Sequence, residues 1–286
     1  MTVELLKPPK TVPKGLELAL GRDGHRAEVS RPLLTLSGRR VLVTGASGSI
    51  GRALVPLLRL NAAEVWETDE STLDVTDFEA VRASNELRSA DVVFHLAGAK
   101  HAPLGEEDPW YTMQVNAVGT FNVLSCAPED ARVVLASTCK ACNPETAYGA
   151  SKLLAEKMTT NAGQTVARFH NVVETSGNVF EIWRQIPEEF PIGYTPCGRY
   201  FISIREAVYL LLWAAQLRPG RYGVWPGERQ EMYDVARRLY PDRELMEIPR
   251  RRGDRSDEPL HAAHEVIVPV PDVPDLMEIV SAHDPL

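Results

Sequence analysis

The sequence of 286 residues predicts an α/β fold, in which a parallel sheet carries helices on both faces. Two patterns lead to this prediction. From residue 40 onward, short apolar runs alternate with longer segments of helical spacing, and a glycine-rich turn joins the first run to the first of those segments. Because strands connected by helices pair in parallel, the alternation favours a doubly wound sheet with a smaller C-terminal portion beside it.

Short apolar runs are typical of buried strands, and the segments between and after them have the spacing of helices. The predicted strands are Val41–Val43, Asp91–Phe94 and Arg132–Ala136. The predicted helices are Ile50–Leu60, Phe78–Leu87, Trp110–Ser125, Val179–Gln185, Ile204–Leu217 and Glu231–Leu239. Beyond residue 173 the chain is richer in proline, arginine and aromatic residues. We therefore expect an N-terminal arm over residues 1–37, a sheet domain over 38–172 and the smaller portion over 173–286, part of which returns to the core.

Composition excludes some classes of protein. Hydrophobic residues make up 44% of the chain, and the formal net charge of -8 with a pI near 5.5 argues against a surface that binds a nucleic-acid backbone. The longest apolar stretch, Val208–Ala215, is too short to cross a bilayer, and Met1–Lys14 lacks the apolar core of a signal peptide. We expect a cytoplasmic protein with no nucleic-acid or membrane partner.

The four cysteines are too few for a disulfide framework in a chain of this length. Cys139 and Cys142 form a Cys-x-x-Cys pair, but no second such pair completes a tetrahedral zinc site, so we expect no bound metal. A redox role is only weakly indicated, because the pair lies inside a longer motif described below. The basic run Arg250–Arg252 is typical of a solvated surface patch.

The glycine-rich turn, Thr44–Gly51, follows the first predicted strand directly. Glycines in such a turn permit a tight bend and a close approach of the backbone to a pyrophosphate, whose charge is met by amide groups at a helix N-terminus. With a strand before it and a helix after it, the turn predicts a Rossmann-like dinucleotide site rather than an ordinary flexible loop. The residues expected to bind the cofactor here are Gly45, Ser47, Gly48, Ser49, Ile50 and Gly51.

An acidic residue about twenty positions after the turn is expected to bind the adenosine ribose. The segment Glu64–Glu70 supplies it, with Asp69 as our first choice and Glu67 as our second. Since no arginine or lysine follows until Arg82, a 2′-phosphate would be repelled, so NAD is predicted as the cofactor rather than NADP. The alternative is that these acids only form a polar strand end.

Tyr148 and Lys152 are four residues apart, which places them on one face of a helix. A lysine ammonium beside a phenol favours the phenolate. Tyr148 is therefore predicted to have a lowered pKa and to accept a proton from a substrate hydroxyl while hydride passes to a nicotinamide. Thr138 ends a predicted strand, at the sheet edge where ligands bind in such folds, and its hydroxyl is expected to hydrogen-bond the same substrate oxygen.

Further segments share their order and spacing with one known family. They are Leu20–Arg22, Leu36–Arg40, His95–Pro103 with Asn116 and Gly119–Thr120, Ser137–Pro144, Arg168–Val172, Ser176–Val179 and Arg199–Ile204. With the motifs above, they resemble the extended short-chain dehydrogenases/reductases and, more narrowly, the inverting UDP-N-acetylglucosamine 4,6-dehydratases of the polysaccharide biosynthesis family. The membrane-attached members carry transmembrane helices ahead of this region, whereas this chain has a short polar arm and resembles the soluble form.

The resemblance implies further contacts and an association into homo-oligomers. The cofactor-binding residues that it implies are Asp74, Leu96, Ala97, Gly98, Lys100, Asn116, Tyr148, Lys152 and Phe169. The substrate-binding residues that it implies are Lys100, His101, Asn171, Val179, Arg199, Arg251 and Glu258. Among these, the segments around Arg199 and from Arg251 to Glu258 hold the diphosphate and ribose of a nucleotide sugar in the family. Within the basic run, only Arg251 gains a function in this interpretation.

One departure from the family affects the chemistry most. The family segment reads Thr-Asp-Lys, in which the acid protonates the leaving hydroxyl at carbon 6 and the lysine helps to remove the carbon 5 proton. Here it reads Thr138-Cys139-Lys140. A neutral thiol still donates a proton, a thiolate stabilised by Lys140 acts as a base or a substrate contact, and a bystander cysteine fits an enzyme that no longer eliminates. His170 and Glu174–Thr175 also depart from the pattern, and we expect them to crowd or re-polarise the sugar pocket.

The leading hypothesis is an NAD-dependent dehydratase that acts on UDP-N-acetylglucosamine or a close relative. Tyr148 takes the carbon 4 hydroxyl proton, Lys140 takes the carbon 5 proton, and Cys139 assists the loss of water, giving a 4-keto-6-deoxy sugar or a 5,6-ene. The predicted catalytic residues are Thr138, Cys139, Lys140, Tyr148 and Lys152. A UDP-sugar 4-epimerase needs no acid at position 139, and a non-catalytic NAD-binding sensor needs none of these side chains.

Overall fold

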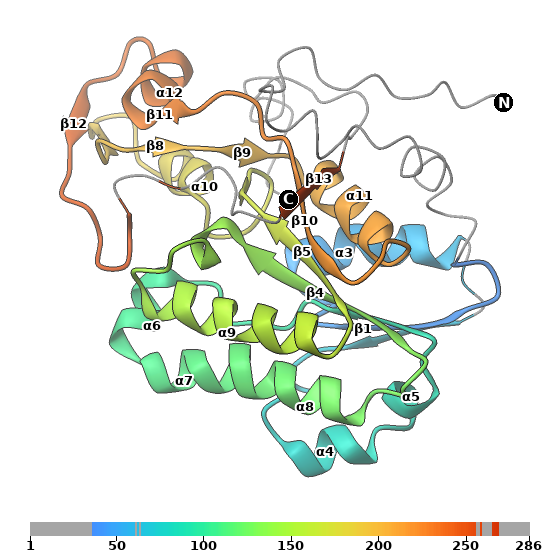
Figure 1. The fold of residues 1–286 in the computed structure, drawn as a ribbon. Coiled ribbons are helices and arrows are strands. Elements are labelled where there is room, and N and C mark those ends of the chain that lie inside the picture. The colour runs from blue at the N-terminus through green and yellow to red at the C-terminus, as the bar shows by residue number, and fades with distance from the viewer. Residues whose placement is uncertain (1–35, 61, 63, 256–257, 259–264, 269–286) are drawn as a thin grey trace, which may run out of the picture.

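A sheet of parallel strands organises the protein, as a computed structural model shows (Figure 1). The structure describes residues 36–60, 62, 64–255, 258 and 265–268. Nearly all of the predicted N-terminal arm, residues 1–37, lies outside the described residues.

The described residues form a seven-stranded sheet in the order β13-β10-β5-β4-β3-β1-β2, and every neighbouring pair is parallel. The strands are β1 (Arg40–Thr44), β2 (Glu64–Thr68), β3 (Val92–His95), β4 (Arg132–Thr138), β5 (Thr165–Phe169), β10 (Gly220–Val224) and β13 (Glu265–Val268). The chain passes from β1 to β2 on one side and then returns to β3 on the other. This reversal confirms the predicted doubly wound topology, and the carboxyl ends of β1 and β3 flank the point where such folds bind ligands.

Helices cover both faces of the sheet (Figure 1). Helices α3 (Ser49–Arg59) and α11 (Ile204–Ala214) pack on one face, and their buried leucines join the main hydrophobic core. Helix α9 (Ala147–Asn161) and helix α8 (Gly119–Cys126) lie side by side on the other face. No helix among the described residues combines the length and the apolar character that crossing a bilayer requires.

Two predicted helices are each divided in the structure. The segment Phe78–Leu87 forms α4 (Phe78–Ala83) and α5 (Asn85–Ser89), because Ser84 is extended at ψ 118° and its hydroxyl accepts a hydrogen bond from the Leu87 amide at 3.2 Å. The serine therefore ends one helix and caps the next.

The predicted helix Trp110–Ser125 is one run made of three pieces. They are α7 (Pro109–Met113), the π-helical turn η2 (Gln114–Val118) and α8. A further short helix, α6 (Ala102–Glu107), precedes them. π-helical turns often mark functional sites, and this one contains the buried Asn116.

Strands β5 and β10 were not among the sequence predictions. Strand β5 contains Arg168, which interrupts its apolar run but is buried because it pairs with Glu156 of α9. Strand β10 contains two glycines, which are depleted in strands. Strand β10 lies between β5 and the edge strand β13, and α11 packs on the same sheet, so these three elements return residues beyond 173 to the core.

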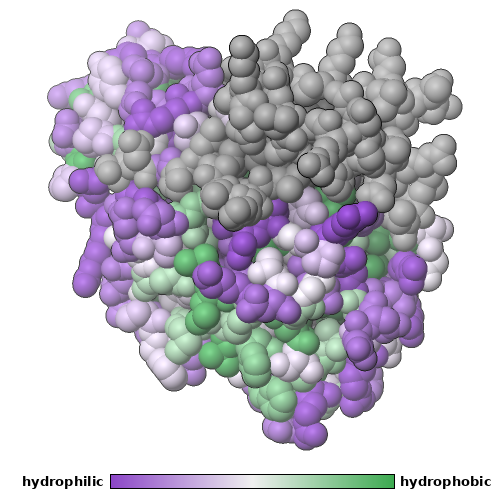
Figure 2. Space-filling model, viewed as in Figure 1, coloured by the Kyte–Doolittle hydropathy of each residue, from purple (hydrophilic) through white to green (hydrophobic). Residues whose placement is uncertain are grey.

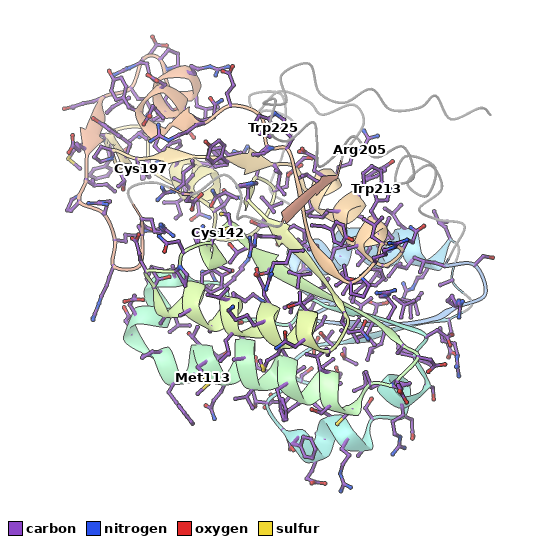
Figure 3. The ribbon with its side chains drawn as sticks, viewed as in Figure 1. Met113, Cys142, Cys197, Arg205, Trp213 and Trp225 are labelled. Carbon is purple, nitrogen blue, oxygen red and sulfur yellow. The ribbon has the colours of Figure 1, made fainter. Side chains whose placement is uncertain are left out.

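A second, smaller core lies beyond the carboxyl ends of the strands (Figure 1). It is built on buried side chains that include Phe180, Trp183, Ile192 and Val235. Its elements are β6 (Asn171–Val172), α10 (Val179–Arg184), β7 (Ile192–Tyr194), β8 (Gly198–Arg199), β9 (Phe201–Ile202), β11 (Gln230–Glu231), α12 (Met232–Leu239) and β12 (Leu245–Glu247). Figure 3 places Cys142 where the sheet meets this portion and Cys197 within it.

Candidate functional site

The glycine-rich turn is fixed by backbone packing. Gly45 has φ +68°, and a Cβ there would lie 2.6 Å from the Ala97 amide nitrogen. Ala97 follows β3, which pairs with β1 so that Thr44 lies opposite His95. The turn after β1 and the segment after β3, including Leu96, are therefore in close contact at the carboxyl edge of the sheet. Helix α3 begins at Ser49, directly after the turn. Gly48 is its N-cap, and no side chain makes a capping hydrogen bond there.

Of the two acids considered for the ribose contact, Asp69 is the better placed. It lies just after β2, and its Oδ1 accepts hydrogen bonds from the Ser71 amide at 3.0 Å and hydroxyl at 2.7 Å, which lower its pKa. Glu67 instead forms an ion pair with Arg59. Asp74 is exposed, and its Oδ1 accepts from the Thr76 amide at 2.8 Å, so in this structure it stabilises a local turn.

Asn116 connects the segment after β3 to helix α9. Its Nδ2 donates to the Ala99 carbonyl at 3.0 Å and to the Ser151 hydroxyl at 3.0 Å, and its Oδ1 accepts from the Ala99 amide at 2.9 Å. A Cβ on Gly98 would lie 3.0 Å from Asn116 Oδ1 and 3.3 Å from Lys152 Nζ. Asn116 and Lys152 therefore converge on Gly98. Burial lowers the pKa of Lys152 to about 8, against the opposing charge of Glu156.

Lys100 and His101 tie the same segment to the smaller portion. Lys100 Nζ donates to the Ser176 carbonyl at 3.0 Å, and the Ser176 amide donates to the Ser49 hydroxyl at 3.1 Å. His101 lies against Gly177, with its Cε1 3.1 Å from the position of a Cβ there. Burial lowers the pKa of Lys100, against the opposing charge of Glu181. Lys100 and His101 thus lie between the glycine-rich turn and the smaller portion.

Tyr148 lies in the first turn of α9, next to the strand end that carries Thr138. Helix α9 is capped by Thr146, whose hydroxyl accepts from the Gly149 amide at 3.0 Å. A Cβ on Gly149 would lie 2.5 Å from the Lys140 carbonyl oxygen, so the helix start packs directly on the Cys139–Ala141 turn (η3). This contact places the Tyr148 phenol and the Thr138 hydroxyl in a hydrogen bond.

The pKa of Tyr148 differs from the sequence expectation. Burial raises it, while the charge of Lys140 and the Thr138 hydrogen bond act in the opposite direction. Lys152 was expected to lower this pKa, but its ammonium lies beside Gly98 and Asn116. In the protein without ligands, the cation that acts on the phenol is therefore Lys140.

The Cys139 side chain is neutral, whereas the Lys140 side chain is positively charged. Cys139 is 1% exposed, and burial together with the Glu258 charge raises the pKa of its thiol to about 12, so the side chain is neutral. This disfavours the thiolate hypothesis. Lys140 Nζ lies 2.7 Å from Glu258 Oε1 and donates to Asn171 Oδ1 at 3.2 Å. Burial alone lowers the pKa of Lys140, but the Glu258 carboxylate raises it above its usual value.

Glu258 is shared by two cations and an amide. Besides Lys140, its carboxylate faces Arg199, whose Nε is 3.6 Å away, and accepts from Asn171 Nδ2 at 2.6 Å. Burial opposes the charge of Glu258, yet the two cations hold its pKa at about 2. Arg251 does not join this group, because it is exposed and pairs with Asp254 at 3.1 Å.

The remaining residues singled out in the sequence pack around this group or stabilise neighbouring elements. Phe169 is buried at the end of β5 and lies opposite Thr138 of β4, while Val179 is half-buried at the start of α10. His170 packs against the Tyr200 ring, with centroids 5.5 Å apart. Glu174 accepts from the Ile204 amide at 2.7 Å and so serves the start of α11.

Sequence reasoning missed two groups of residues. Glu156, one helical turn after Lys152, accepts hydrogen bonds from Arg168 of β5 and Ser137 of β4, and an ion pair links it to Arg221 of β10. The spacing of four residues from Lys152 was a usable signal for Glu156. Arg255 donates to the Asn143 carbonyl at 2.7 Å and the Cys142 carbonyl at 3.0 Å, and no sequence pattern indicated this contact.

Within the described residues, no three histidine, cysteine, aspartate or glutamate side chains are grouped to hold a metal ion. Cys139 and Cys142 form no disulfide, and the Cys142 sulfur accepts a hydrogen bond from Arg168 at 2.9 Å.

A family model described as polysaccharide biosynthesis protein matches residues 60–279. The chain belongs to this family. An uncharacterized membrane protein of Methanocaldococcus jannaschii is 34% identical over 214 residues, which are 64% of each chain and so less than two thirds of that relative. A UDP-N-acetylglucosamine 4,6-dehydratase (inverting) of Campylobacter jejuni is 28% identical over 257 residues, 77% of this chain and 76% of the relative. These matches confirm the resemblance inferred from the motifs.

Among solved structures, the UDP-glucose 4-epimerase of Thermus thermophilus in complex with NAD superposes with a TM-score of 0.69 at 22% identity. The match covers 80% of this chain and 90% of the epimerase. At this identity the likeness concerns the fold, and it confirms the predicted Rossmann-like architecture.

Proposed function

We propose that the protein is an NAD-dependent nucleotide-sugar dehydratase that acts on UDP-N-acetylglucosamine or a close relative. The observation that carries the proposal is the group formed by Thr138, Tyr148 and Lys140, beside the segments that flank the glycine-rich turn. The family match and the name of the Campylobacter relative support the class of substrate.

The residues present fit a nicotinamide dinucleotide. The first turn of α3 has no side-chain cap, which suits its amide groups to a pyrophosphate, and the proposed ribose contact is Asp69, just after β2. Lys152 is buried near Gly98 with a lowered pKa, so hydroxyl acceptors from a bound ribose would stabilise its ammonium. NAD, when bound, supplies a hydride acceptor that is regenerated in each turnover.

Asp69 also favours NAD over NADP, because its carboxylate would repel a 2′-phosphate. We expect calorimetry to show tighter binding of NAD than of NADP, and Asp69→Ala to reduce the difference about tenfold or more. Glu67→Ala is the matched control, and equal selectivity of the wild type for both cofactors would contradict the assignment.

The first chemical step needs a base beside the sugar. Tyr148 is placed to accept the proton of the carbon 4 hydroxyl, and Thr138 hydrogen-bonds at the same point. Since burial raises the pKa of the phenol, the nearby Lys140 charge matters for forming the phenolate. The product of this step is a ketone at carbon 4, which acidifies the proton on carbon 5.

Elimination then requires a second base and an acid. Lys140 is proposed to take the carbon 5 proton, and the neutral Cys139 thiol to donate a proton to the hydroxyl that leaves carbon 6. The product is a 4-keto-6-deoxy sugar or a 5,6-unsaturated sugar, depending on which carbon is reduced.

A 4-epimerase is the second candidate, and one observation favours it. The base of the elimination, Lys140, is engaged with Glu258 in an ion pair, and epimerisation at carbon 4 needs neither this base nor an acid at position 139. A non-catalytic sensor is less well supported, because a sensor has no need of the contact between Thr138 and Tyr148.

The test is mass spectrometry and proton NMR of UDP-N-acetylglucosamine incubated with the NAD-loaded enzyme. Dehydration removes one water, about 18 mass units, and Tyr148→Phe and Cys139→Ala are each expected to slow it by about a hundred-fold or more. A methyl signal at carbon 6 identifies the 6-deoxy product, and a methylene signal identifies the 5,6-ene.

Two variants serve as matched controls. Cys142→Ala removes the neighbouring buried thiol, and Tyr209→Phe removes a phenol on α11; both are expected to keep dehydration within about threefold of wild type, because the proposed reaction uses neither side chain. An isomer of unchanged mass, formed equally well by Cys139→Ala, would replace the dehydratase with the epimerase.

We also propose that the enzyme forms a homo-oligomer. Trp110, Phe121 and Leu154 are 64%, 52% and 47% exposed, on the face formed by α7, α8 and α9, where Figure 2 shows apolar side chains gathered. Light scattering after gel filtration should give a multiple of the 31.7 kDa chain, and Phe121→Asp should reduce it to a monomer.

A further inference from the structure

Lys140 cannot be a base while it remains an ammonium ion, and the structure surrounds it with groups that keep it one. Its Nζ lies 2.7 Å from Glu258 Oε1 and 3.2 Å from Asn171 Oδ1. The other titratable groups that act on it are Cys139, on its own turn, and Tyr148 of α9. Both are neutral in the empty site, so among the described residues the charge that balances Lys140 is that of Glu258.

The two cations that face Glu258 carry more positive charge than its single carboxylate neutralises. Its single carboxylate faces Lys140 and, at 3.6 Å from Oε1, Arg199, while Asn171 donates to the second oxygen. Counted over the described residues, one negative charge between two cations leaves an excess of one positive charge in a mostly buried site. An anionic ligand is therefore attracted to Arg199, and the acceptor oxygens of Glu258 are suited to hydroxyl donors that arrive with it.

Loss of Glu258 as a partner would change the proton affinity of Lys140. Burial by itself lowers the pKa of this lysine, and the Glu258 carboxylate reverses that effect. The Lys140 side chain is 17% exposed, so a proton leaving Nζ has access to water. Once the lysine is a neutral amine, its lone pair accepts the carbon 5 proton and the ammonium ion is restored, so the proton count balances.

We propose that Glu258 is a switch for Lys140: it holds the lysine as an ammonium ion in the empty site and releases it as a base when the hydroxyls of a bound nucleotide engage the carboxylate. This inference rests on the proposed function, because the ligand is the nucleotide of the substrate. Glu258 is a positioning residue in this scheme. The base exists only when the substrate is present.

The protonation state of Lys140 can be followed directly by NMR. The chain contains seven lysines, Lys7, Lys10, Lys14, Lys100, Lys140, Lys152 and Lys157, so lysine labelled with ¹³C at Cε gives few signals. Lys140→Arg identifies the signal of interest. In the NAD-loaded wild type we expect this signal not to titrate up to about pH 11, since an ion pair in a buried site raises a lysine pKa above its usual 10.4.

Two comparisons test the switch. In Glu258→Gln, the Lys140 midpoint is expected to fall by about 2 pH units or more, as for other buried lysines without a counter-ion. In the wild type, UDP is expected to lower the midpoint, whereas 2′,3′-dideoxy-UDP, which carries the same charge but lacks the ribose hydroxyls, is not. The ligand comparison needs no variant, so it stands even where Glu258→Gln folds poorly.

Asp254→Asn is the matched control, because it neutralises a carboxylate four residues earlier that pairs with Arg251 and not with Lys140. Binding of UDP with an unchanged Lys140 midpoint would overturn the switch and leave the proposed substrate class intact. An unchanged midpoint in a folded Glu258→Gln would overturn it as well. A failure of UDP to bind would overturn both the switch and the uridine-nucleotide substrate.

Discussion

Glu156 and Glu258 are both carboxylates with fully buried side chains, and each lies between two cations. Glu156 is held by Arg168 of β5 and Arg221 of β10, on neighbouring strands of the sheet. Glu258 is held by Lys140 and Arg199, which come from a turn and from the smaller portion. The partners of Glu156 are fixed by strand pairing, whereas those of Glu258 depend on how loops meet. The same ionic arrangement thus joins strands of the sheet in one place and, in our proposal, serves the reaction in the other.

The largest effect on stability is expected for Glu156, the acid that links the sheet strands. Glu156→Gln leaves the buried Arg168 and the half-buried Arg221 beside an uncharged amide, so the free energy of unfolding should fall by about 3–5 kcal/mol. Urea unfolding followed by circular dichroism measures this change. A loss under about 1 kcal/mol would mean that Glu156 does not hold the strands together.

The next effect is the pH dependence of stability that Glu258 confers. Glu258 has its pKa lowered from 4.5 to about 2, so its contribution to stability is present above pH 4.5 and is lost as the pH falls from 4.5 towards 2. At 1.4 kcal/mol per unit, this contribution is about 3 kcal/mol. Urea unfolding at pH 7, 4.5 and 2.5 should show a smaller acid loss in Glu258→Gln than in the wild type. Equal acid losses would place the stabilising charge elsewhere.

Arg199, beside Glu258, and Arg221, beside Glu156, should differ in their effect on ligand binding. Arg199→Met removes a charge that faces the site and is expected to weaken UDP binding by about 1.5–3 kcal/mol, roughly ten- to a hundred-fold. Arg221→Met removes the corresponding cation at Glu156 and should leave UDP binding unchanged. Isothermal titration calorimetry compares the two, and a similar loss in both variants would remove the distinction between scaffold and site.

The smallest effect is expected at the surface. Arg59 and Glu67 form an ion pair between α3 and β2 with 62% and 36% of their side chains exposed. Glu67→Gln should change the free energy of unfolding by less than about 1 kcal/mol, because water and salt screen an exposed pair. The same urea experiment measures it. An effect as large as that of Glu156→Gln would show that burial is not what separates these pairs.

Local patterns were sufficient to predict much of the fold. The turn at Gly45, the strand before it and the helix after it follow from short-range spacing, as do strands β3 and β4, and the structure has them where the sequence places them. Strand β5 was missed because Arg168 makes its sequence look exposed, although a partner 12 residues away in the chain neutralises that charge. A strand whose charged residue is neutralised by a partner elsewhere in the chain cannot be predicted from local hydrophobicity alone.

The residues of the candidate site stay predictions, and the sequence indicated few of the contacts between them. The contact of Tyr148 with Thr138 agrees with the spacing of the two residues, whereas the pairing of Lys140 with Glu258 depends on how the C-terminal segment folds back over the turn after β4. Arg255 makes a similar long-range contact with Asn143. Such contacts are decided by tertiary packing, which motif spacing does not contain.

The position of Glu258 late in the chain also has a consequence for biosynthesis. Asn171 and Glu258 are 87 residues apart, so at a synthesis rate of 5–20 residues per second the ribosome adds the acid roughly 4–17 s after its amide partner. During that interval the strands up to β5 have already been made, and Lys140 has no counter-ion. Of the seven described strands of the sheet, six precede Glu258 in the chain and β13 follows it, so most of the sheet is synthesised before the acid that balances the charge of Lys140.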